Sequence, residues 1–346
     1  MSKTAHVMAD DVRPRNEKPV LTVASERLHI VKPRGDGCVP LYISGDSPSA
    51  EATRLVVMLH GRLRDADAYL RSTQRALAAS SVDANSVILA VPQFLASADV
   101  EHHGLADEYL HWEWTSWMGG LDATGPATLS SFDVLDALIA HFAARGGFPA
   151  LREIVIAGHS GGAQVAHRHA ILSDAAAHCA ALGVRLRYVI ANPSSYVYFD
   201  ELRPARNGTF HPADRAACHD FNAWKYGTER LPRYAGDTDA RALEQRYIGQ
   251  DVTYLLGTLD NDPAHPALDR SCAATLQGPD RLARGRAYHA YLRGRHPQLE
   301  HALHEVQGAA HSGDAMFVSS AGVRALFGDD AQLVDLAPSQ AGGALE

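Results

Sequence analysis

The stretch Glu153–Gly162, EIVIAGHSGG, decides the expected fold. Its apolar half predicts a buried strand, and a helix is predicted to begin at about Gly161. Ser160 then lies in the tight turn between strand and helix, where the flanking glycines remove the Cβ atoms that would collide. This G-x-S-x-G pattern predicts a serine hydroxyl at the edge of a sheet, beside a helix N-terminus whose dipole favours developing negative charge.

Short apolar runs alternate with helical patterns along the rest of the chain. The run Leu55–Leu59 ends in His60-Gly61 and precedes an amphipathic pattern over 66–77, while Ser130 or Ser131 can cap a second helix. Further strands are expected at 86–91, 186–191, 252–256 and 303–306, with an antiparallel start within 20–31 and 39–43. This alternation predicts an α/β fold with a mostly parallel central sheet and helices on both faces.

The length of 346 residues permits one large domain or two. We expect a single domain over 19–327, with a flexible N-terminus at 1–18 and a loosely ordered tail at 328–346. Two stretches, 92–128 and 192–250, are longer than a strand and helix alternation needs. Both leave the carboxyl end of an expected parallel strand, where open α/β sheets bind ligands, so we expect them to form the walls or lid of a site.

Charge and hydropathy exclude several classes of partner. The chain has 32 Lys and Arg against 40 Asp and Glu, a net charge of −8, and no long run of like charges, so no nucleic-acid partner is expected. No apolar run approaches the ~20 residues that span a bilayer, so no membrane partner is expected. The N-terminal residues carry no apolar signal-peptide core, which predicts a cytoplasmic protein, with a trimmed secreted form as the alternative.

The cysteines and histidines indicate neither a metal site nor a cofactor. Cys38, Cys179, Cys218 and Cys272 lie far apart without a C-x-x-C motif. We expect buried free thiols, with a Cys218–Cys272 disulfide as the alternative, because the segments around these two cysteines bracket one insertion. The 19 histidines, including the pair His102-His103, occur without an H-E-x-x-H helix, and the chain lacks a dinucleotide or phosphate-binding glycine motif.

A serine hydroxyl becomes a strong nucleophile only when a base accepts its proton, and that base needs a carboxylate to orient it. The expected strand at 252–256 runs into GTLDND, which places Asp260 or Asp262 at its carboxyl end. Among the histidines after these acids, only His311 lies in a loop just beyond an expected strand and before a new helix. The residues therefore occur in the chain order serine, acid, histidine.

With these motifs the chain resembles the α/β-hydrolase superfamily from about Leu55 to Phe327. The resemblance implies that Ser160 is the nucleophile, His311 the general base and then acid, and Asp260 the orienting carboxylate, with Asp262 as its alternative. It also implies that the backbone N–H groups of Arg62 and Gly161 form the oxyanion hole. His60 and His159 occupy turn positions and are expected to have structural roles.

Two aromatic groups follow strand ends and have two interpretations each. Trp112, Trp114 and Trp117 in one insertion, and Tyr196 and Tyr198 in the other, either pack the insertions or form an aromatic wall for the acyl group.

The expected function is hydrolysis of a small-molecule or polymeric carboxylic ester through an acyl-enzyme, without a cofactor. An amidase or peptidase, a thioesterase and a polyester depolymerase remain alternatives on the same residues, as do lyase or acyltransferase chemistry and a ligand-binding protein without turnover.

Overall fold

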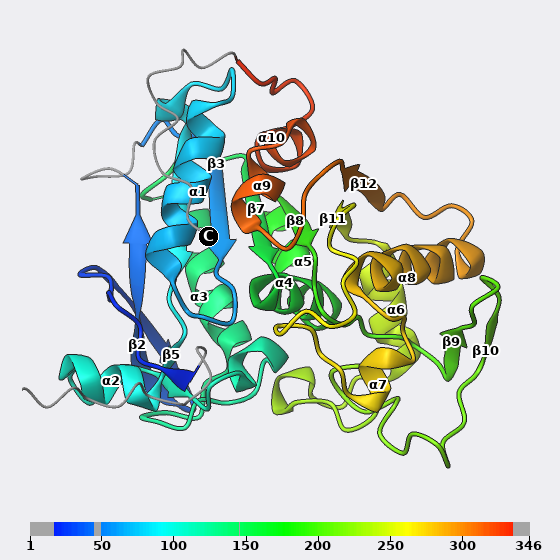
Figure 1. The fold of residues 1–346 in the computed structure, drawn as a ribbon. Helices are drawn as coiled ribbons and strands as arrows, with labels where there is room; N and C mark the ends of the chain where they lie inside the picture. Colours follow the sequence, from blue (N-terminus) through cyan, green and yellow to red (C-terminus); the bar gives the residue numbers. More distant parts are fainter. Residues whose placement is uncertain (1–16, 45–49, 145, 335–346) are drawn as a thin grey trace, which may run out of the picture.

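The computed structural model describes residues 17–44, 50–144 and 146–334. Its centre is an eight-stranded sheet with the order β1-β2-β4-β3-β7-β8-β11-β12, in which β1 and β2 are antiparallel and the other strands run parallel (Figure 1). The strands are β1 (Arg27–Lys32), β2 (Gly35–Ile43), β3 (Arg54–Leu59), β4 (Val87–Pro92), β7 (Glu153–His159), β8 (Arg185–Ala191), β11 (Asp251–Gly257) and β12 (Ala302–Val306). The predicted fold class is confirmed.

Alternate residues of each central strand face opposite layers of the core. In β3, Leu55, Val57 and Leu59 pack on one face, whereas Val56 and Met58 pack on the other. Because both faces are covered, the strand is a continuous apolar run without polar alternation. This is why the parallel strands were recognisable in the sequence.

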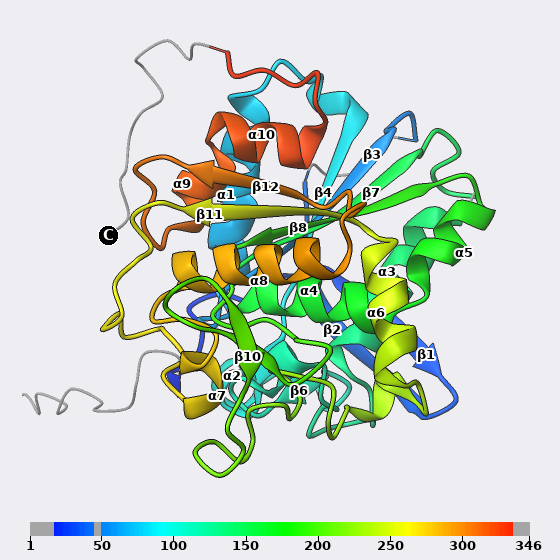
Figure 2. The same cartoon turned by 90° about the vertical axis from the view of Figure 1, so that its right-hand side faces the viewer.

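Helices cover both faces of the sheet, as Figure 2 shows. One face carries α1 (Ala66–Ala78), α9 (Gly313–Phe317) and α10 (Ser320–Phe327), and the other carries α3 (Ser131–Ala143), α4 (Gly161–Leu172), α5 (Ala175–Ala181), α6 (Ala240–Ile248) and α8 (Arg281–Arg295). The hydroxyl of Ser130 caps α3 by accepting from the N–H of Asp133, as the sequence predicts. A short 3₁₀ turn, η2 (Ala84–Ser86), precedes β4.

The two long insertions fold into small elements of their own. The first contains β5 (Leu95–Ala96), α2 (Ser97–His103), β6 (His111–Trp112) and η3 (Ser116–Gly119), and the second contains β9 (Leu202–Pro204), β10 (Phe210–Pro212), η4 (Arg233–Ala235) and α6. A third excursion, which we did not expect, occupies 258–280 between β11 and α8 and includes α7 (Cys272–Thr275). In Figure 1, β9, β10 and α7 gather beside α8.

A disulfide joins the second insertion to the third excursion. Cys218 and Cys272 are bonded, whereas Cys38 and Cys179 are buried free thiols. The expectation of four free thiols is therefore wrong for the first pair, and the alternative pairing is the one found. Phe221 and Ala273 pack against Cys218, so the bond lies in a small apolar cluster separate from the sheet.

The chain ends differ from the expectation where they are described. Of the expected flexible segment 1–18, residues 1–16 lie outside the described residues, and the carbonyl of Lys18 accepts a hydrogen bond from Arg64. Of the expected loose tail, residues 335–346 also lie outside, but 328–334 dock on the end of α1. There the N–H of Val334 donates to Ala79 O at 2.8 Å, and Ala331 is buried.

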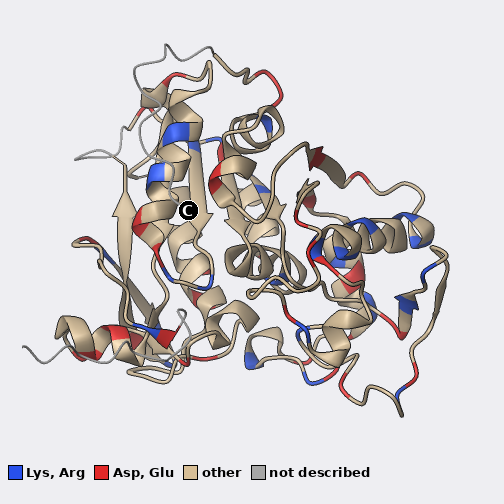
Figure 3. Cartoon of the chain, in the orientation of Figure 1, with Lys and Arg blue, Asp and Glu red and all other residues tan. Residues whose placement is uncertain are grey.

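Positions of basic and acidic residues are interspersed along the ribbon, as Figure 3 shows. None of the helices in the described ranges is long and apolar enough to cross a membrane.

Candidate active site

Ser160 lies in a strained turn between β7 and α4. Its backbone has φ 56° and ψ −112°, in the left-handed half of conformational space that non-glycine residues rarely adopt. A Cβ on Gly158 would lie 2.3 Å from the carbonyl carbon of Gly162, and a Cβ on Gly162 would lie 2.2 Å from the carbonyl oxygen of Leu59. Only glycine therefore fits at either position, and the turn presents the serine at the carboxyl edge of the sheet.

His311 lies within hydrogen-bonding distance of both partners that the sequence assigned to it. Its Nε2 is 3.0 Å from Ser160 Oγ, and its Nδ1 is 2.7 Å from Asp260 Oδ2. The three residues follow β7, β11 and β12, whose carboxyl ends meet at one edge because the strands are parallel. We call Ser160, Asp260 and His311 the catalytic edge, after the role proposed for them below.

The structure separates the two candidate acids. Asp260 is buried, whereas Asp262 is exposed and its Oδ1 accepts from the N–H of Ala264. Asp260 Oδ1 also accepts from the guanidinium of Arg281 at 3.1 Å, and Arg281 Nε donates to Ser194 Oγ at 3.2 Å. The carboxylate next to the imidazole is therefore held from both sides.

Burial and the neighbouring charges shift the pKa values of Asp260 and His311. Burial raises the pKa of Asp260, but the hydrogen bond from His311 and the charge of Arg281 outweigh it, so the pKa lies below its usual value. Burial lowers the pKa of His311, and Arg281 and His265 lower it further, while Asp260 opposes them. The imidazole is therefore neutral, as a proton acceptor must be, to lower pH than an exposed histidine.

Two further imidazoles flank His311. The ring centres of His159 and His265 lie 4.5 Å and 5.0 Å from it. His159 Nδ1 is 3.1 Å from the hydroxyl of Tyr69, and burial holds the pKa of His159 well below its usual value. His159 thus packs the site as a neutral ring, which agrees with the expected structural role.

The turn after β3 places a second backbone amide near Ser160. A Cβ on Gly161 would lie only 3.1 Å from the backbone nitrogen of Arg62, so the two amides adjoin one space beside Ser160. His60 fixes this turn, because its Nε2 accepts from the N–H of Phe94 at 2.9 Å and its Nδ1 lies 2.8 Å from the carbonyl oxygen of Gly61. The first amides of α4 have no acceptor within the helix, so such a space suits an oxyanion.

Comparison with known proteins supports the fold. No protein-family model and no curated protein matches the sequence. Among solved structures, poly(aspartic acid) hydrolase-1 from Sphingomonas sp. KT-1 matches with a TM-score of 0.58 and 23% identity over 86% of this chain and 96% of that one. LpqC, a poly(3-hydroxybutyrate) depolymerase from Bordetella parapertussis, matches with a TM-score of 0.55 and 20% identity over 84% and 86%.

The chain has the α/β-hydrolase fold. In this fold, residues of both insertions line the cavity over Ser160. It measures about 240 Å³ and is lined by Arg62, Ser160, Gly161 and Gln164 of the core, Thr115 and Met118 of the first insertion, Ser194, Lys225 and Tyr226 of the second, and Ala267, Leu268 and Asp269 of the third excursion.

The aromatic wall requires correction. Trp112, Trp117, Tyr196 and Tyr198 are completely buried, and none of them lines the cavity over Ser160. Trp117 packs on His60 and Phe94, and Tyr196 stacks on Tyr288. These aromatic rings therefore pack within the insertions, and the prediction that they contact the substrate is wrong.

Trp114 is also absent from the lining of this cavity. It is partly exposed and has the guanidinium of Arg64 5.1 Å above its ring. Trp114 therefore makes a packing contact with Arg64 and does not form a wall of the cavity over Ser160.

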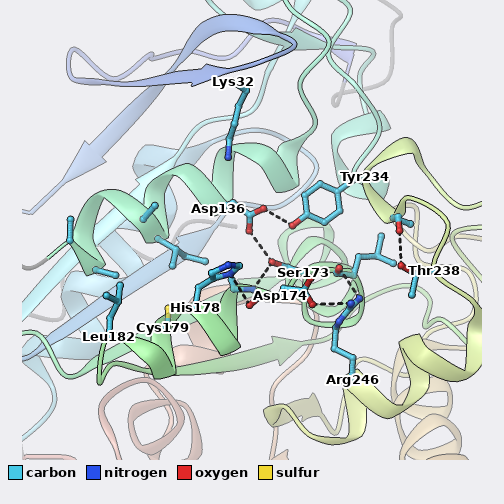
Figure 4. A pocket seen from close by; sticks show the side chains of 17 residues that line it. Lys32, Asp136, Ser173, Asp174, His178, Cys179, Leu182, Tyr234, Thr238 and Arg246 are labelled. Atoms are coloured by element: carbon cyan, nitrogen blue, oxygen red, sulfur yellow. Dashed lines mark hydrogen bonds and ion pairs between the residues drawn. The ribbon is translucent and has the colours of Figure 1, made fainter.

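A larger cavity of about 720 Å³ lies between α3 and α5 (Figure 4). Its lining includes Asp136, which accepts from Tyr234 and Ser173, and Arg246, which pairs with Asp174. Leu172, at the far end of α4, also lines it. Since α4 has 12 residues, this end lies roughly 18 Å along the helix from Ser160, and the cavity is separate from the catalytic edge.

Sequence reasoning missed the polar residues that surround the catalytic edge. Arg281 opens α8, Ser194 follows β8, and Lys225 and Asp269 lie in irregular segments. None of them belongs to a motif of fixed spacing, and only the position of Ser194 just after a parallel strand could have indicated a site residue. Within the described segments, no group of three His, Cys, Asp or Glu side chains could hold a metal ion.

Proposed function

We propose that this protein is a serine hydrolase that cleaves a carboxylic ester through an acyl-enzyme. The observation that carries the proposal is the hydrogen-bonded chain from Ser160 through His311 to Asp260 at the strand ends of an α/β-hydrolase fold. A serine, an imidazole and a buried carboxylate at these distances are suited to acyl transfer.

In the proposed reaction Ser160 Oγ attacks the ester carbonyl while His311 Nε2 accepts the hydroxyl proton. The negative charge on the carbonyl oxygen is stabilised by the N–H groups of Arg62 and Gly161. Collapse of the tetrahedral intermediate breaks the bond to the alcohol oxygen, which takes the proton from His311. Water then attacks the acyl-enzyme, His311 accepts its proton and returns it to Ser160, and the acid is released.

Asp260 contributes by orienting the imidazole and by stabilising its positive charge during each step. Arg281 positions Asp260 by donating a hydrogen bond to its carboxylate. Ser194 positions Arg281 by accepting a hydrogen bond from its Nε. The sequence alternatives of an amidase, a thioesterase and a polyester depolymerase use the same residues. The two structural neighbours are named for hydrolysis of poly(aspartic acid) and poly(3-hydroxybutyrate). Amide and polyester substrates should therefore be assayed together with simple esters.

The Cys218–Cys272 disulfide bears on where the enzyme works. Stable disulfides are typical of oxidising compartments and rare in the cytosol. The bond therefore favours the secreted alternative over the cytoplasmic expectation.

Treatment with a fluorophosphonate followed by intact-mass and peptide analysis tests the proposal. We expect one adduct, mapped to Ser160, with the loss of activity on p-nitrophenyl esters following its formation. A folded protein that forms no adduct contradicts the hydrolase proposal and supports a ligand-binding role on the same fold.

A further inference from the structure

The cavity over Ser160 is lined mainly by polar side chains, and its charges are not balanced. Arg62 and Lys225 both line it, against one carboxylate, Asp269. The cavity of about 240 Å³ has room for roughly eight water volumes, so a small acyl or alcohol group that occupies it lies near these charges.

A third cation lies directly behind the cavity lining. Arg168 of α4 is completely buried. Within the described part of the chain its guanidinium donates to four neutral acceptors: Met118 O at 2.5 Å, Gln164 Oε1 at 2.8 Å, Ser195 Oγ at 3.1 Å and Lys225 O at 3.5 Å. Its Nε has no hydrogen-bond partner among the described residues. Three of these acceptors belong to residues that line the cavity, Met118, Gln164 and Lys225. Burial lowers the pKa of Arg168 to about 10, and the charges of Tyr226 and Asp269 oppose this only in part. A buried cation without a directly bonded carboxylate is costly, and a nearby anion would lower that cost.

The single carboxylate of the cavity is already occupied. Asp269 accepts from the hydroxyl of Tyr226 at 2.7 Å and from the N–H of Ser271 at 3.0 Å, and it lies 3.4 Å from Lys225 Nζ. That last distance is longer than the 2.7–2.9 Å typical of a charge-assisted hydrogen bond, so the ammonium keeps donors for another partner. Burial lowers the pKa of Lys225 and the charge of Arg168 lowers it further, while Asp269 opposes both.

Arg62 has no counter-ion among the described residues. No ion pair is found for its guanidinium, and burial alone lowers its pKa. It is half-buried at the turn that also supplies a backbone amide to the site. Arg62 and Lys225 therefore line the same cavity as Ser160, and Arg168 contacts residues of that lining from behind. These three residues are called the cationic wall below.

We propose that the substrate carries a carboxylate or a similar anionic group a few bonds from the scissile carbonyl, and that Lys225 and Arg62 contact this group. The inference rests on the proposed hydrolase function and specifies its substrate class. Arg168 acts from behind the lining, by raising the electrostatic potential that the anion meets. Neutral apolar esters gain nothing from these cations and must displace water from polar groups.

Two pairs of esters of matched shape test the proposal. Monoethyl succinate and ethyl levulinate place a carboxylate or a ketone on the acyl arm, and acetoxyacetate and acetoxyacetone place them on the alcohol arm. Proton release in a pH-stat gives kcat/KM for each ester. We expect the anionic member of at least one pair to be favoured about tenfold, which corresponds to one charge-assisted hydrogen bond in a partly buried site.

Substitutions in the cationic wall test whether its residues cause the preference for anionic esters. Lys225→Gln should lower the anionic-to-neutral ratio by about tenfold and Lys225→Glu should invert it, with a smaller decrease for Arg62→Gln. Arg206→Gln is the matched control, because Arg206 is an exposed cation between β9 and β10 and away from the cavity. It should leave the ratio and the activity unchanged.

The outcomes separate this inference from the function on which it rests. Equal rates within each pair, or a preference that both Lys225 variants retain, overturn the anionic substrate class while the hydrolase function stands. If a fluorophosphonate labels Ser160 but no ester of either pair is cleaved, the substrate class is again wrong. If no adduct forms on Ser160, the proposed function fails and this inference fails with it.

Discussion

The catalytic edge and the cationic wall meet at one cavity but are built differently. The three residues of the catalytic edge follow strands of the central sheet, and neighbouring glycines and buried polar groups hold them in one geometry. Lys225 of the wall lies in the second insertion, in a segment between β10 and η4 without helix or strand. A disulfide and surface ion pairs such as Arg215–Glu229 tie this segment together. The difference teaches that the reaction depends on the sheet, whereas substrate choice depends on segments that can change without disturbing it.

Loss of the nucleophile should have the largest effect on the catalytic edge. Ser160→Ala removes the atom that forms the acyl-enzyme, and we expect kcat to fall by on the order of 10⁶-fold, with substrate binding largely retained. Steady-state kinetics on the preferred ester, with circular dichroism to verify folding, measures this. A variant that keeps a tenth of the activity would show that another group is the nucleophile.

The two aspartates after β11 should differ strongly despite lying two positions apart. Asp260→Asn loses the charge that stabilises the imidazolium and should lower kcat by about 10⁴-fold. Asp262→Asn is the matched control, because this carboxylate is exposed and accepts from a loop amide, and it should change kcat by less than about twofold. The comparison fails if the second variant is the inactive one.

Arg281 links the catalytic edge to helix α8 and should tune its pH dependence. Its charge lowers the pKa of His311, so removal in Arg281→Met raises that pKa. Because His311 must be neutral to accept a proton, the acidic limb of kcat/KM against pH should move to higher pH, with a loss of about tenfold at neutral pH.

Arg281→Lys serves as the control, since it keeps a cation beside Asp260. It should leave the limb close to its original position. An acidic limb that does not move in the methionine variant, or moves to lower pH, would contradict the assigned role.

The disulfide should matter least for the reaction and more for the insertion. Cys218→Ser with Cys272→Ser frees a loop of 54 residues, so the chain-entropy model sets the loss in the free energy of unfolding at about 4 kcal/mol or less. We expect a lower melting temperature and a kcat within about threefold of the original, because the bond lies in a cluster separate from the sheet. A complete loss of kcat at a temperature where the variant is folded would mean that the insertion shapes the catalytic edge itself.

The residues of the catalytic edge were easier to find in the sequence than those of the cationic wall, because their signal lies in the sequence immediately around them. Ser160 and His311 lie in turns next to strands, so the chain around each residue carries the signal, and Asp260 needed only the choice against Asp262. Trp117 and Tyr196 could not be assigned in this way, because a large aromatic residue suits a packed core and a substrate wall equally well.

The polar surroundings of the site could not be predicted from spacing. Arg281 contacts a residue 21 positions away and Arg168 contacts one 57 positions away, and such pairs follow from the folded insertions alone. The same limit applies to the disulfide, since connectivity cannot be deduced from cysteine spacing.

The central claim is that Ser160 carries the acyl group during turnover, and a trapped acyl-enzyme tests it most directly. The protein is mixed with p-nitrophenyl acetate, quenched in acid within the first turnover, and analysed by mass spectrometry of the intact chain and its peptides. The account predicts a burst of p-nitrophenol and one acetyl group on the peptide that contains Ser160, both absent from Ser160→Ala. Turnover without any acetylated serine, or an acetyl group on another residue, would contradict it.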